Sequence, residues 1–461
     1  MTTGTIEYPR AFAVWFKDLS RWDASSFHRI KWHWPQRVMA PIGSALRPRK
    51  ERVDRTAFKF SDLQPITIHF DGSIDKRTVD PNREYSMDLW FARPGDIVVA
   101  KIDLKNGAVG VVPPEWHNVV VTGHFAVYEP DRSKLIAEYL HLIIQAPFFK
   151  AHMWRNKVGA EGRKEVKLDF FERELIPLPP LATQRAIVAR WRAAQDEIAA
   201  ARERVEARKA ATNARFFVDL GLRPPDALAM PRAFAVWWQD FLRWGVSFNF
   251  LNQSGADLSR GQYSVEYLDS LISLVQYGTS EKANTSGDGV PIIRMNNLVD
   301  GELDLTNLKH ICLPKDEVEK LKLKEGDILF NRTNSKELVG KCAVFHANGD
   351  FVFASYLIRV RANVAKADPD FLAYVINSPI GRQQINALSR QIIGQANVNS
   401  EELRGLQIPS PPPTVQKEMM RRVMNGRMEM ARECKAADEL SNAINTELEA
   451  LILGIRRLSE R

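Results

Sequence analysis

Short, mostly apolar runs beside glycine-containing turns occur in the same order in both halves of the chain, and they predict β-strands. Residues 66–70 and 291–295 are such runs, each followed by an Asp-Gly turn. Residues 97–100 and 328–330 follow Gly-Asp turns, and their uninterrupted hydrophobicity is typical of buried strands. The pattern therefore predicts two β-rich modules of the α+β class.

Helical spacing follows the strands in both halves. Residues 138–152 and 369–389 are each expected to form one helix, and a much longer helix is expected after each of the Pro-Pro pairs at 179–180 and 411–412. The long helices carry apolar residues alternately three and four positions apart, which is typical of a seam between paired helices. The seam positions are Ile187, Trp191, Ala194, Ile198, Ala201 and Val205 in the first helix, and Ile444, Leu448, Leu451 and Ile455 in the second.

We predict that these two helices pair with each other as an antiparallel coiled coil. The small side chains of Ala194 and Ala201 would let the two backbones approach closely. The alternative is that each helix packs only on its own module. Their length favours pairing, because helices in globular domains average about 11–12 residues.

The chain also repeats itself. The sequence Pro-Arg-Ala-Phe-Ala-Val-Trp occurs at residues 9–15 and again at 231–237, and Gln184 later matches Gln416. The matching residues are 222 to 232 positions apart, which is far longer than any solenoid repeat, so a whole module with its helix has been duplicated. We expect a first module at 1–180, a long helix at 181–220, a linker at 221–230, a second module at 231–412 and a second long helix at 413–461.

The charge balance narrows the class of partner. The 461 residues include 64 Lys and Arg against 56 Asp and Glu, giving a net charge of +8 and a pI of about 9.3. A pI above 9 is typical of nucleic-acid binders, although ribosome- and membrane-surface proteins share it. No apolar run approaches the roughly 20 residues of a membrane span, and the three cysteines form no Cys-x-x-Cys pair, so the chain is expected to be cytoplasmic. The nine histidines are scattered, so no metal site is expected.

Several catalytic motifs are absent from the sequence. It contains no Asn/Asp-Pro-Pro-aromatic motif for adenine methylation, no Gly-x-x-x-x-Gly-Lys-Ser/Thr loop for ATP and no Gly-x-Ser-x-Gly elbow. This favours a DNA-reading protein without catalytic residues over an enzyme. A self-sufficient DNA-modifying or nuclease enzyme remains the alternative, because nuclease motifs are too loose to exclude.

The motifs around the Pro-Pro pairs resemble a known family. Ile-Pro-Leu-Pro-Pro at 176–180 precedes Gln184, Ile-Pro-Ser-Pro-Pro at 408–412 precedes Gln416, and residues 324–330 and 394–399 contribute further similarity. Together they resemble the specificity (S) subunit of type I restriction–modification systems. The resemblance extends over nearly the whole chain.

That resemblance implies two target recognition domains that each read one half of a bipartite, asymmetric DNA site. It further implies that the helices set the spacing and dock two methyltransferase subunits, with restriction subunits joining indirectly. S-adenosylmethionine would then bind to the methyltransferase subunits, and this chain would need no cofactor of its own.

Polar loops at the strand ends supply candidate DNA contacts, because Arg and Lys suit guanine, Asn and Gln suit adenine, and many such side chains bind phosphate. In the first module the candidates are Lys101, Lys105, Asn106, Arg155, Lys157, Arg163 and Lys164. In the second they are Arg294, Asn296, Asn297, Arg332, Thr333, Asn334, Ser335, Lys336, Gln391, Gln395 and Asn397. The alternative for any one of them is a solvated loop side chain.

Overall fold

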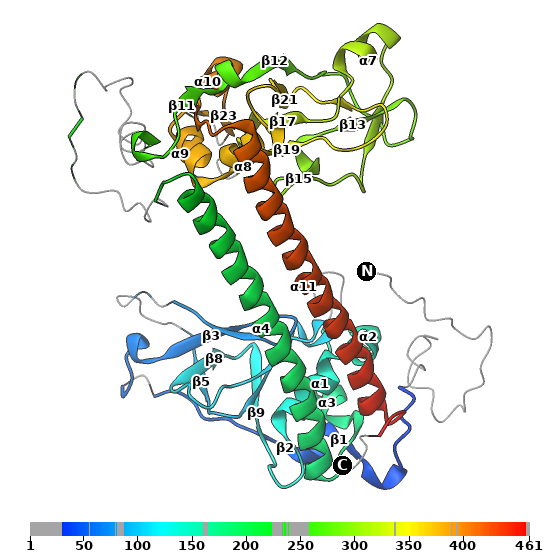
Figure 1. The fold of residues 1–461 in the computed structure, drawn as a ribbon. Coiled ribbons are helices and arrows are strands. Elements are labelled where there is room, and N and C mark those ends of the chain that lie inside the picture. Colours follow the sequence, from blue (N-terminus) through cyan, green and yellow to red (C-terminus); the bar gives the residue numbers. More distant parts are fainter. Residues whose placement is uncertain are drawn as a thin grey trace. The chain divides into compact units, whose positions relative to one another are not determined.

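The computed structural model divides the chain into two compact units, each containing one β-rich module and part of both long helices (Figure 1). Unit 1 comprises Met1–Ala200 and Ala436–Arg461, and unit 2 comprises Ala201–Lys435. The structure describes residues 30–223 except 55, 79, 81–86 and 160–164, then 233, 235, 236 and 238, and 258–457 except 336, 337, 389, 393 and 394. The heptapeptide at 9–15, most of its second copy, and Arg163, Lys164 and Lys336 lie outside these residues.

Unit 1 is built on two four-stranded sheets that pack face to face. The first is antiparallel, in the order β2 (Leu46–Pro48), β9 (Phe125–Pro130), β6 (Ile97–Ala100) and β7 (Val109–Val111). The second has the order β4 (Ile74–Lys76), β3 (Gln64–Ile68), β8 (Val119–Thr122) and β5 (Leu89–Ala92), with β3 and β8 parallel. A separate pair joins β1 (Met39–Pro41) to β10 (Leu175–Pro177).

Alternation along β6 explains how the first sheet is covered on both faces. Ile97 and Val99 point into a core shared with helices α1 (Ala137–Gln145) and α2 (Pro147–Arg155). Val98 points the other way, into the core between the two sheets. Because both faces are buried, the strand is apolar throughout, as the sequence predicts. A short helix, α3 (Leu168–Arg173), lies between α2 and β10 in the chain.

Unit 2 repeats this architecture. Its antiparallel sheet has the order β12 (Ile272–Tyr277), β21 (Leu357–Ala362), β17 (Asp327–Asn331) and β19 (Cys342–Val344), and its second sheet has the order β16 (Lys309–Ile311), β13 (Val290–Ile293) and β20 (Val352–Phe353), with β13 and β20 parallel. The pair β11 (Val265–Tyr267) and β24 (Gln407–Pro409) corresponds to β1 and β10. The remaining helices are α6 (Leu268–Leu271), α7 (Lys315–Leu321), α8 (Pro369–Asn377), α9 (Pro379–Leu388) and α10 (Ser400–Arg404).

Unit 2 also has two small additions. The strands β14 (Leu298–Val299) and β15 (Glu302–Leu303) form a hairpin whose turn contains Asp300 and Gly301, both with positive φ. A three-stranded sheet has the order β18 (Thr333–Asn334), β23 (Gln395–Asn397) and β22 (Arg390–Ile392).

The prediction of a single helix at 138–152 and another at 369–389 is wrong, because each region forms two helices. Ala146 and Ser378 adopt extended conformations, with ψ of 132° and 167°, and Pro147 and Pro379 then start new helices. A residue before proline is disfavoured in helical geometry, while proline itself fits the first helical position. The break is therefore local in origin and repeated in both units.

The Val-Gly pairs at 109–110 and 339–340 look alike in the sequence and suggest equivalent strand starts, but they are not equivalent in the structure. Val109 and Gly110 lie within β7, whereas Val339 and Gly340 lie in the turn before β19. The glycine that corresponds to Gly340 is Gly107, since both have positive φ, at 81° and 88°. A Cβ at Gly107 would lie 2.4 Å from Cε of Lys150, and one at Gly340 would lie 2.6 Å from Cγ2 of Ile385, so both turns need glycine.

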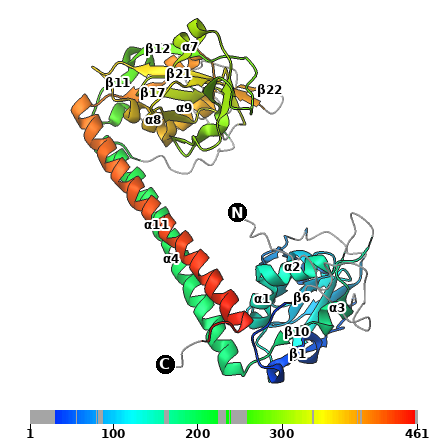
Figure 2. The ribbon, with the colours of Figure 1, turned by 90° about the vertical axis from the view of Figure 1, so that its right-hand side faces the viewer.

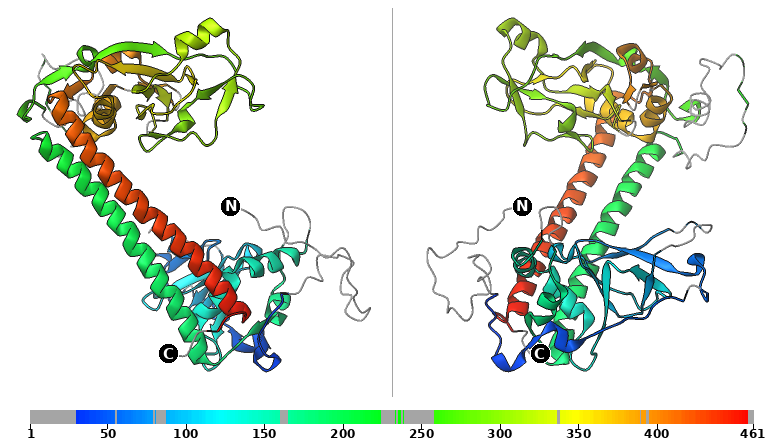
Figure 3. Two further views of the ribbon diagram at one scale, coloured as in Figure 1. Left: turned by 45° about the vertical axis from the view of Figure 1, so that its right-hand side comes forward. Right: turned by 180° about the vertical axis from the view of Figure 1, so that it is seen from behind.

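The long helices α4 (Leu181–Asp219) and α11 (Pro413–Leu453) lie side by side (Figures 2 and 3). In unit 1, Arg190 pairs with Glu447 at 2.9 Å, and in unit 2, Arg208 pairs with Glu429 and with Glu433. Within unit 2, Arg208 pairs with Glu429 and Asp219 pairs with Arg422, so the partner numbers fall as the α4 numbers rise. The helices are therefore antiparallel, which confirms the predicted pairing. Ile187, Ala194, Ile444, Leu448 and Leu451 are all buried in the core of unit 1.

The other seam positions differ in burial. Ile198 and Ala201 are buried, and Trp191 and Val205 are partly buried. The assignment of Ile455 to the seam is wrong, because α11 ends at Leu453 and Ile455 is 62% exposed. Gly454, with φ of 78°, turns the chain away, and Ile452 fills the core instead.

A buried glutamine anchors the first turn of each long helix to its module. Gln184 accepts a hydrogen bond from the Ile136 N–H and donates to the carbonyl oxygens of Lys134 and Pro179, all at 2.8–2.9 Å. Gln416 does the same with the Asp368 N–H and the carbonyl oxygens of Lys366 and Pro411. Both side chains are fully buried, so the repeat preserves an anchor and not a surface residue. Within the described residues, no helix is long and apolar enough to cross a membrane.

Candidate nucleic-acid interface

In unit 2 the structure brings the three predicted polar segments together. Strand β18 pairs with β23, so that Thr333 lies opposite Asn397, and their side chains are hydrogen-bonded at 3.3 Å. The Asn334 amide contacts the sulfur of Met295 at 3.4 Å, which places the segment around 294–297 beside the same loop. Residues distant in sequence therefore form one polar surface at the end of β17.

Arg332 is the best-positioned cation of this surface. Its backbone N–H donates to the Tyr356 carbonyl oxygen at 3.0 Å, and its guanidinium carbon lies 4.7 Å from the centroid of the Tyr277 ring. The Tyr277 hydroxyl in turn accepts a hydrogen bond from the Ser400 N–H at 3.1 Å. The Arg332 Nε is buried and has no hydrogen-bond partner among the described residues. Stacking on tyrosine holds the planar guanidinium in place, an arrangement suited to bidentate recognition.

The remaining candidate residues of unit 2 differ in their exposure to solvent and in their hydrogen bonds. Asn296 and Asn397 are exposed, and Arg294 and Ser335 are partly buried. Asn297 is buried, and its side chain accepts a hydrogen bond from the Arg294 N–H and donates to the Asp304 carbonyl oxygen, so it holds the turn together. The backbones of Gln391 and Gln395 lie in β22 and β23.

Unit 1 has the same scaffold with different side chains. The Lys101 N–H donates to the His124 carbonyl oxygen at 3.1 Å, which is the bond that Arg332 makes to Tyr356. The Lys101 ammonium donates to the Gly123 carbonyl oxygen at 2.7 Å. Lys105 and Asn106 follow on a short 3-10 helix, Leu104–Asn106. A bridge between Val158 and Glu165 corresponds to the β22–β23 hairpin.

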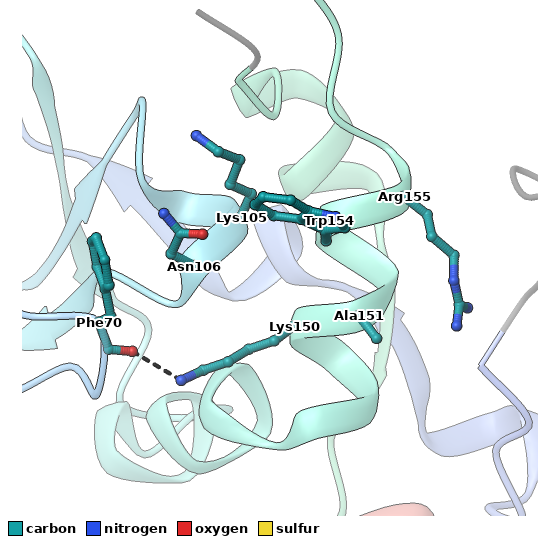
Figure 4. Close-up of a pocket in the computed structure, with 7 residues that line it drawn as sticks. All are labelled: Phe70, Lys105, Asn106, Lys150, Ala151, Trp154 and Arg155. Atoms are coloured by element: carbon teal, nitrogen blue, oxygen red, sulfur yellow. Dashed lines mark hydrogen bonds between the residues drawn. The ribbon is translucent and has the colours of Figure 1, made fainter. Parts of the chain in front are cut away.

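Lys105, Asn106 and Arg155 line one solvent-open cavity of about 570 Å³ in unit 1 (Figure 4). The other lining residues are Phe70, from the turn after β3, and Lys150, Ala151 and Trp154 from α2. Lys157 lies beside the cavity, with its ammonium 3.3 Å from the centroid of the Trp154 ring. The structure therefore joins four of the predicted basic and amide residues to two aromatic side chains that sequence reasoning missed.

The cavity has a positive lining. Among the described residues that line it, Lys105, Lys150 and Arg155 are cationic and none is a carboxylate. The Lys105 and Lys150 ammonium groups donate to the carbonyl oxygens of Ile102 and Phe70, at 2.7 and 2.8 Å. Partial burial lowers the pKa of Lys150, against the smaller opposing effect of the Asp71 charge. A nearby anion would stabilise the charged form of Lys150 and so oppose this lowering of its pKa.

A second cavity, of about 750 Å³, lies in unit 2 between the β14–β15 hairpin and the two long helices. It is lined by acidic as well as basic residues, and Arg427 pairs with Glu302 at 3.4 Å across it. Such a mixed lining does not favour a polyanion. Among the residues that the structure describes, no group of three or more His, Cys, Asp and Glu side chains is placed to hold a metal ion.

Comparisons with known proteins agree with this arrangement. Residues 272–425 match the family model described as the type I restriction modification DNA specificity domain. The chain is 26% identical to the type I restriction enzyme EcoKI specificity subunit of Escherichia coli, over 72% of this chain and 67% of that subunit. It is also 26% identical to the StySPI specificity subunit of Salmonella potsdam, over 60% of this chain and 57% of that subunit.

The aligned region covers only 42% of another curated relative, from Methanocaldococcus jannaschii. Among solved structures, a chain from work on complex assembly and conformational transition of the type I R-M system shares the fold. Its TM-score is 0.57 at 16% identity, over 90% of this chain and 97% of that one. The matched specificity domain, the curated relatives and the shared fold confirm the resemblance of this chain to type I restriction–modification specificity subunits.

Proposed function

We propose that this chain selects the DNA sequence for a type I restriction–modification complex, with each module reading one half of a bipartite, asymmetric site. The observation that carries the proposal is the pair Lys101 and Arg332. They directly follow the equivalent strands β6 and β17 and make the same backbone hydrogen bond, yet they stand among different side chains. A duplicated scaffold with two unlike polar surfaces suits a target with two unlike halves.

The chemistry of both surfaces fits double-stranded DNA. Arg332, Asn334 and Asn397 offer the donors and acceptors that read guanine and adenine edges, while lysines such as Lys101 and Lys105 suit phosphate. A net charge of +8 adds a long-range attraction that weakens as salt concentration rises.

The helix pair has two proposed roles, which are to set the distance between the half-sites and to dock two methyltransferase subunits. Each helix advances about 1.5 Å per residue, so its length converts directly into a distance along DNA. The proposal places S-adenosylmethionine and catalysis on the methyltransferase subunits, with restriction subunits joining through them. The relatives that this chain matches are specificity subunits, so a self-sufficient enzyme is not favoured.

The test is an exchange of one module. Residues 258–405 are replaced by the equivalent residues of a relative with a different known site, and the variant is expressed with its methyltransferase subunit. Methylome sequencing should show one altered half-site, one retained half-site and an unchanged gap, because the helices are the same. A matched exchange of residues 42–174 should alter the other half only. Changes in both halves from a single exchange would contradict modular reading.

A further inference from the structure

We propose that the cavity of unit 1 binds one nucleotide of the target DNA with its base displaced from the duplex and stacked between Phe70 and Trp154. This inference rests on the proposed function, and it assigns to unit 1 a contact that unit 2 lacks.

The first argument is the placement of the two rings. Figure 4 shows Phe70 and Trp154 on either side of the cavity, with Asn106 and Lys150 between them. Phe70 is 57% exposed and Trp154 is 48% exposed. Leaving two large apolar side chains in water around one hollow costs free energy, and a stacked base would recover it because every base has an apolar face.

The second argument is the charge around the rings. Lys105, Lys150 and Arg155 line the same cavity, and Lys157 lies against the Trp154 ring. A group that satisfies this lining must combine a flat aromatic surface with negative charge, and a nucleotide does both. The Asn106 amide nitrogen donates to the Asp103 carboxylate at 3.0 Å, which leaves its second N–H and its carbonyl oxygen for the edge of a base.

The third argument is the contrast with unit 2. Helices α2 and α9 both begin with proline, so Trp154 corresponds to Asn386, and Phe70 before the Asp71-Gly72 turn corresponds to Val299 before Asp300-Gly301. Lys150 corresponds to Arg382, whose guanidinium donates to the Val339 carbonyl oxygen. The scaffold of unit 2 therefore carries no aromatic pair at this place, and the site is specific to unit 1.

The test measures DNA binding by the full chain with its methyltransferase subunits. Trp154→Ala and Phe70→Ala should each weaken binding to the specific site about 5- to 150-fold, the range for loss of one base–aromatic stack. Trp154→Phe should restore most of the affinity. The slope of affinity against salt should stay unchanged, because no charge is removed, whereas Lys105→Ala should reduce it by about one. Tyr267→Ala removes an equally exposed ring elsewhere and should have no effect.

Placing 2-aminopurine at successive positions of the half-site identifies the displaced base. One position read by unit 1 should change fluorescence on binding, and this change should be lost in Trp154→Ala. Competition with a free deoxynucleotide distinguishes DNA from a small-molecule source, and competition at micromolar concentration would overturn the assignment to DNA.

Three other results would also overturn the inference. These are binding by Trp154→Ala within twofold of the unaltered protein, weaker binding with no fluorescent position, and normal DNA binding with lost methyltransferase assembly, which would identify a protein-docking surface. If the unaltered complex bound no specific DNA, the proposed function itself would fail together with the inference.

Discussion

The two modules share a scaffold and differ at the surface that ends β6 and β17. In unit 1 this surface has Lys101 beside His124 and leads to an aromatic, cationic hollow. In unit 2 it has Arg332 stacked on Tyr277, with the exposed Tyr356 next to it. The comparison shows that backbone geometry can be held constant while the chemistry of the surface side chains changes, provided that these side chains lie at strand ends and do not enter the core.

The two units also differ in a buried ion pair. Asp96 and Asp327 are equivalent buried residues that accept hydrogen bonds from the N–H groups of Arg93 and Lys324. The arginine that pairs with each comes from a different strand, Arg49 after β2 in unit 1 and Arg361 in β21 in unit 2. Unit 2 adds Arg359, which is almost fully buried at 3.7 Å from Asp327.

The largest expected effect is on the free energy of unfolding, and we expect it to differ between these two buried carboxylates. Asp327→Ala should destabilise unit 2 by about 3–5 kcal/mol, because it leaves the buried Arg359 without a countercharge. Asp96→Ala should cost less, about 1–3 kcal/mol, since Arg49 is 22% exposed and also lies 3.6 Å from Glu129. Hydrogen exchange in denaturant, read separately for β6 and β17, measures both.

The matched control for the carboxylate pair is Asp316→Ala, which removes an exposed carboxylate of unit 2. It should leave exchange from β17 unchanged. Equal losses in Asp96→Ala and Asp327→Ala would show that Arg359 is stabilised by its other hydrogen bonds, to the carbonyl oxygens of Lys322 and Lys320 at 2.7 and 2.9 Å.

The second prediction sharpens the contrast between these two polar surfaces. Arg332→Lys keeps the charge but removes the planar fork, so one guanine of the unit 2 half-site should become degenerate, at a cost of about 1–3 kcal/mol in discrimination. Tyr277→Leu should weaken the same position, because the stacking that orients Arg332 is lost. Lys101→Arg in unit 1 should leave the recognised DNA sequence unchanged. Methylome sequencing compares all three, and an unchanged motif in Arg332→Lys would reassign Arg332 to phosphate.

The smallest expected effect concerns pH, and it has opposite signs in the two units. Burial lowers the pKa of His141 in unit 1, although its contact with the Val109 carbonyl oxygen opposes this. In unit 2, partial burial alone would lower the pKa of His346, but hydrogen bonds to Glu325 and Asp370 and their charges raise it.

The signs follow from an unfolded pKa of about 6.5 for both histidines. The contribution of His141 is complete above that value and is lost as the pH falls toward its lowered folded pKa. The contribution of His346 is complete below that value and is lost as the pH rises through its raised folded pKa. Between pH 8 and 5.5, unit 1 should therefore weaken and unit 2 should gain about 0.5 kcal/mol or less, since His346 is half exposed. Hydrogen exchange corrected for intrinsic rates checks this, with His141→Gln and His346→Gln abolishing the trends.

Local patterns predicted the strands, the turns and the antiparallel helices, because period, proline and glycine act over a few residues. The duplication itself located Gln184 and Gln416, but only the structure shows that they are buried anchors. Asn297 shows the limit of reasoning from residue type, since an amide that caps a turn and one that reads a base look the same in sequence.

The cavity of unit 1 could not be predicted because its parts come from distant segments, at 70, 105–106 and 150–155. A useful signal was nevertheless present, since Lys150 and Trp154 are four residues apart and so share one face of α2. Sequence reasoning did not use this signal, because it predicted one continuous helix at 138–152 that ends before Trp154. The break before Pro147 separates the two helices and lets this face remain exposed.

The core of unit 1 has a consequence for the order in which the protein folds. It includes Ile444, Leu448, Leu451 and Ile452, which follow the whole large core of unit 2 in the chain, since that core needs nothing beyond Val423. During translation, unit 2 can therefore complete its packing first, although its module follows in the chain. The module that leaves the ribosome first must wait, with an apolar face of α4 uncovered, until the final turns of α11 arrive. Premature termination near residue 440 would thus damage the N-terminal half more than the C-terminal half.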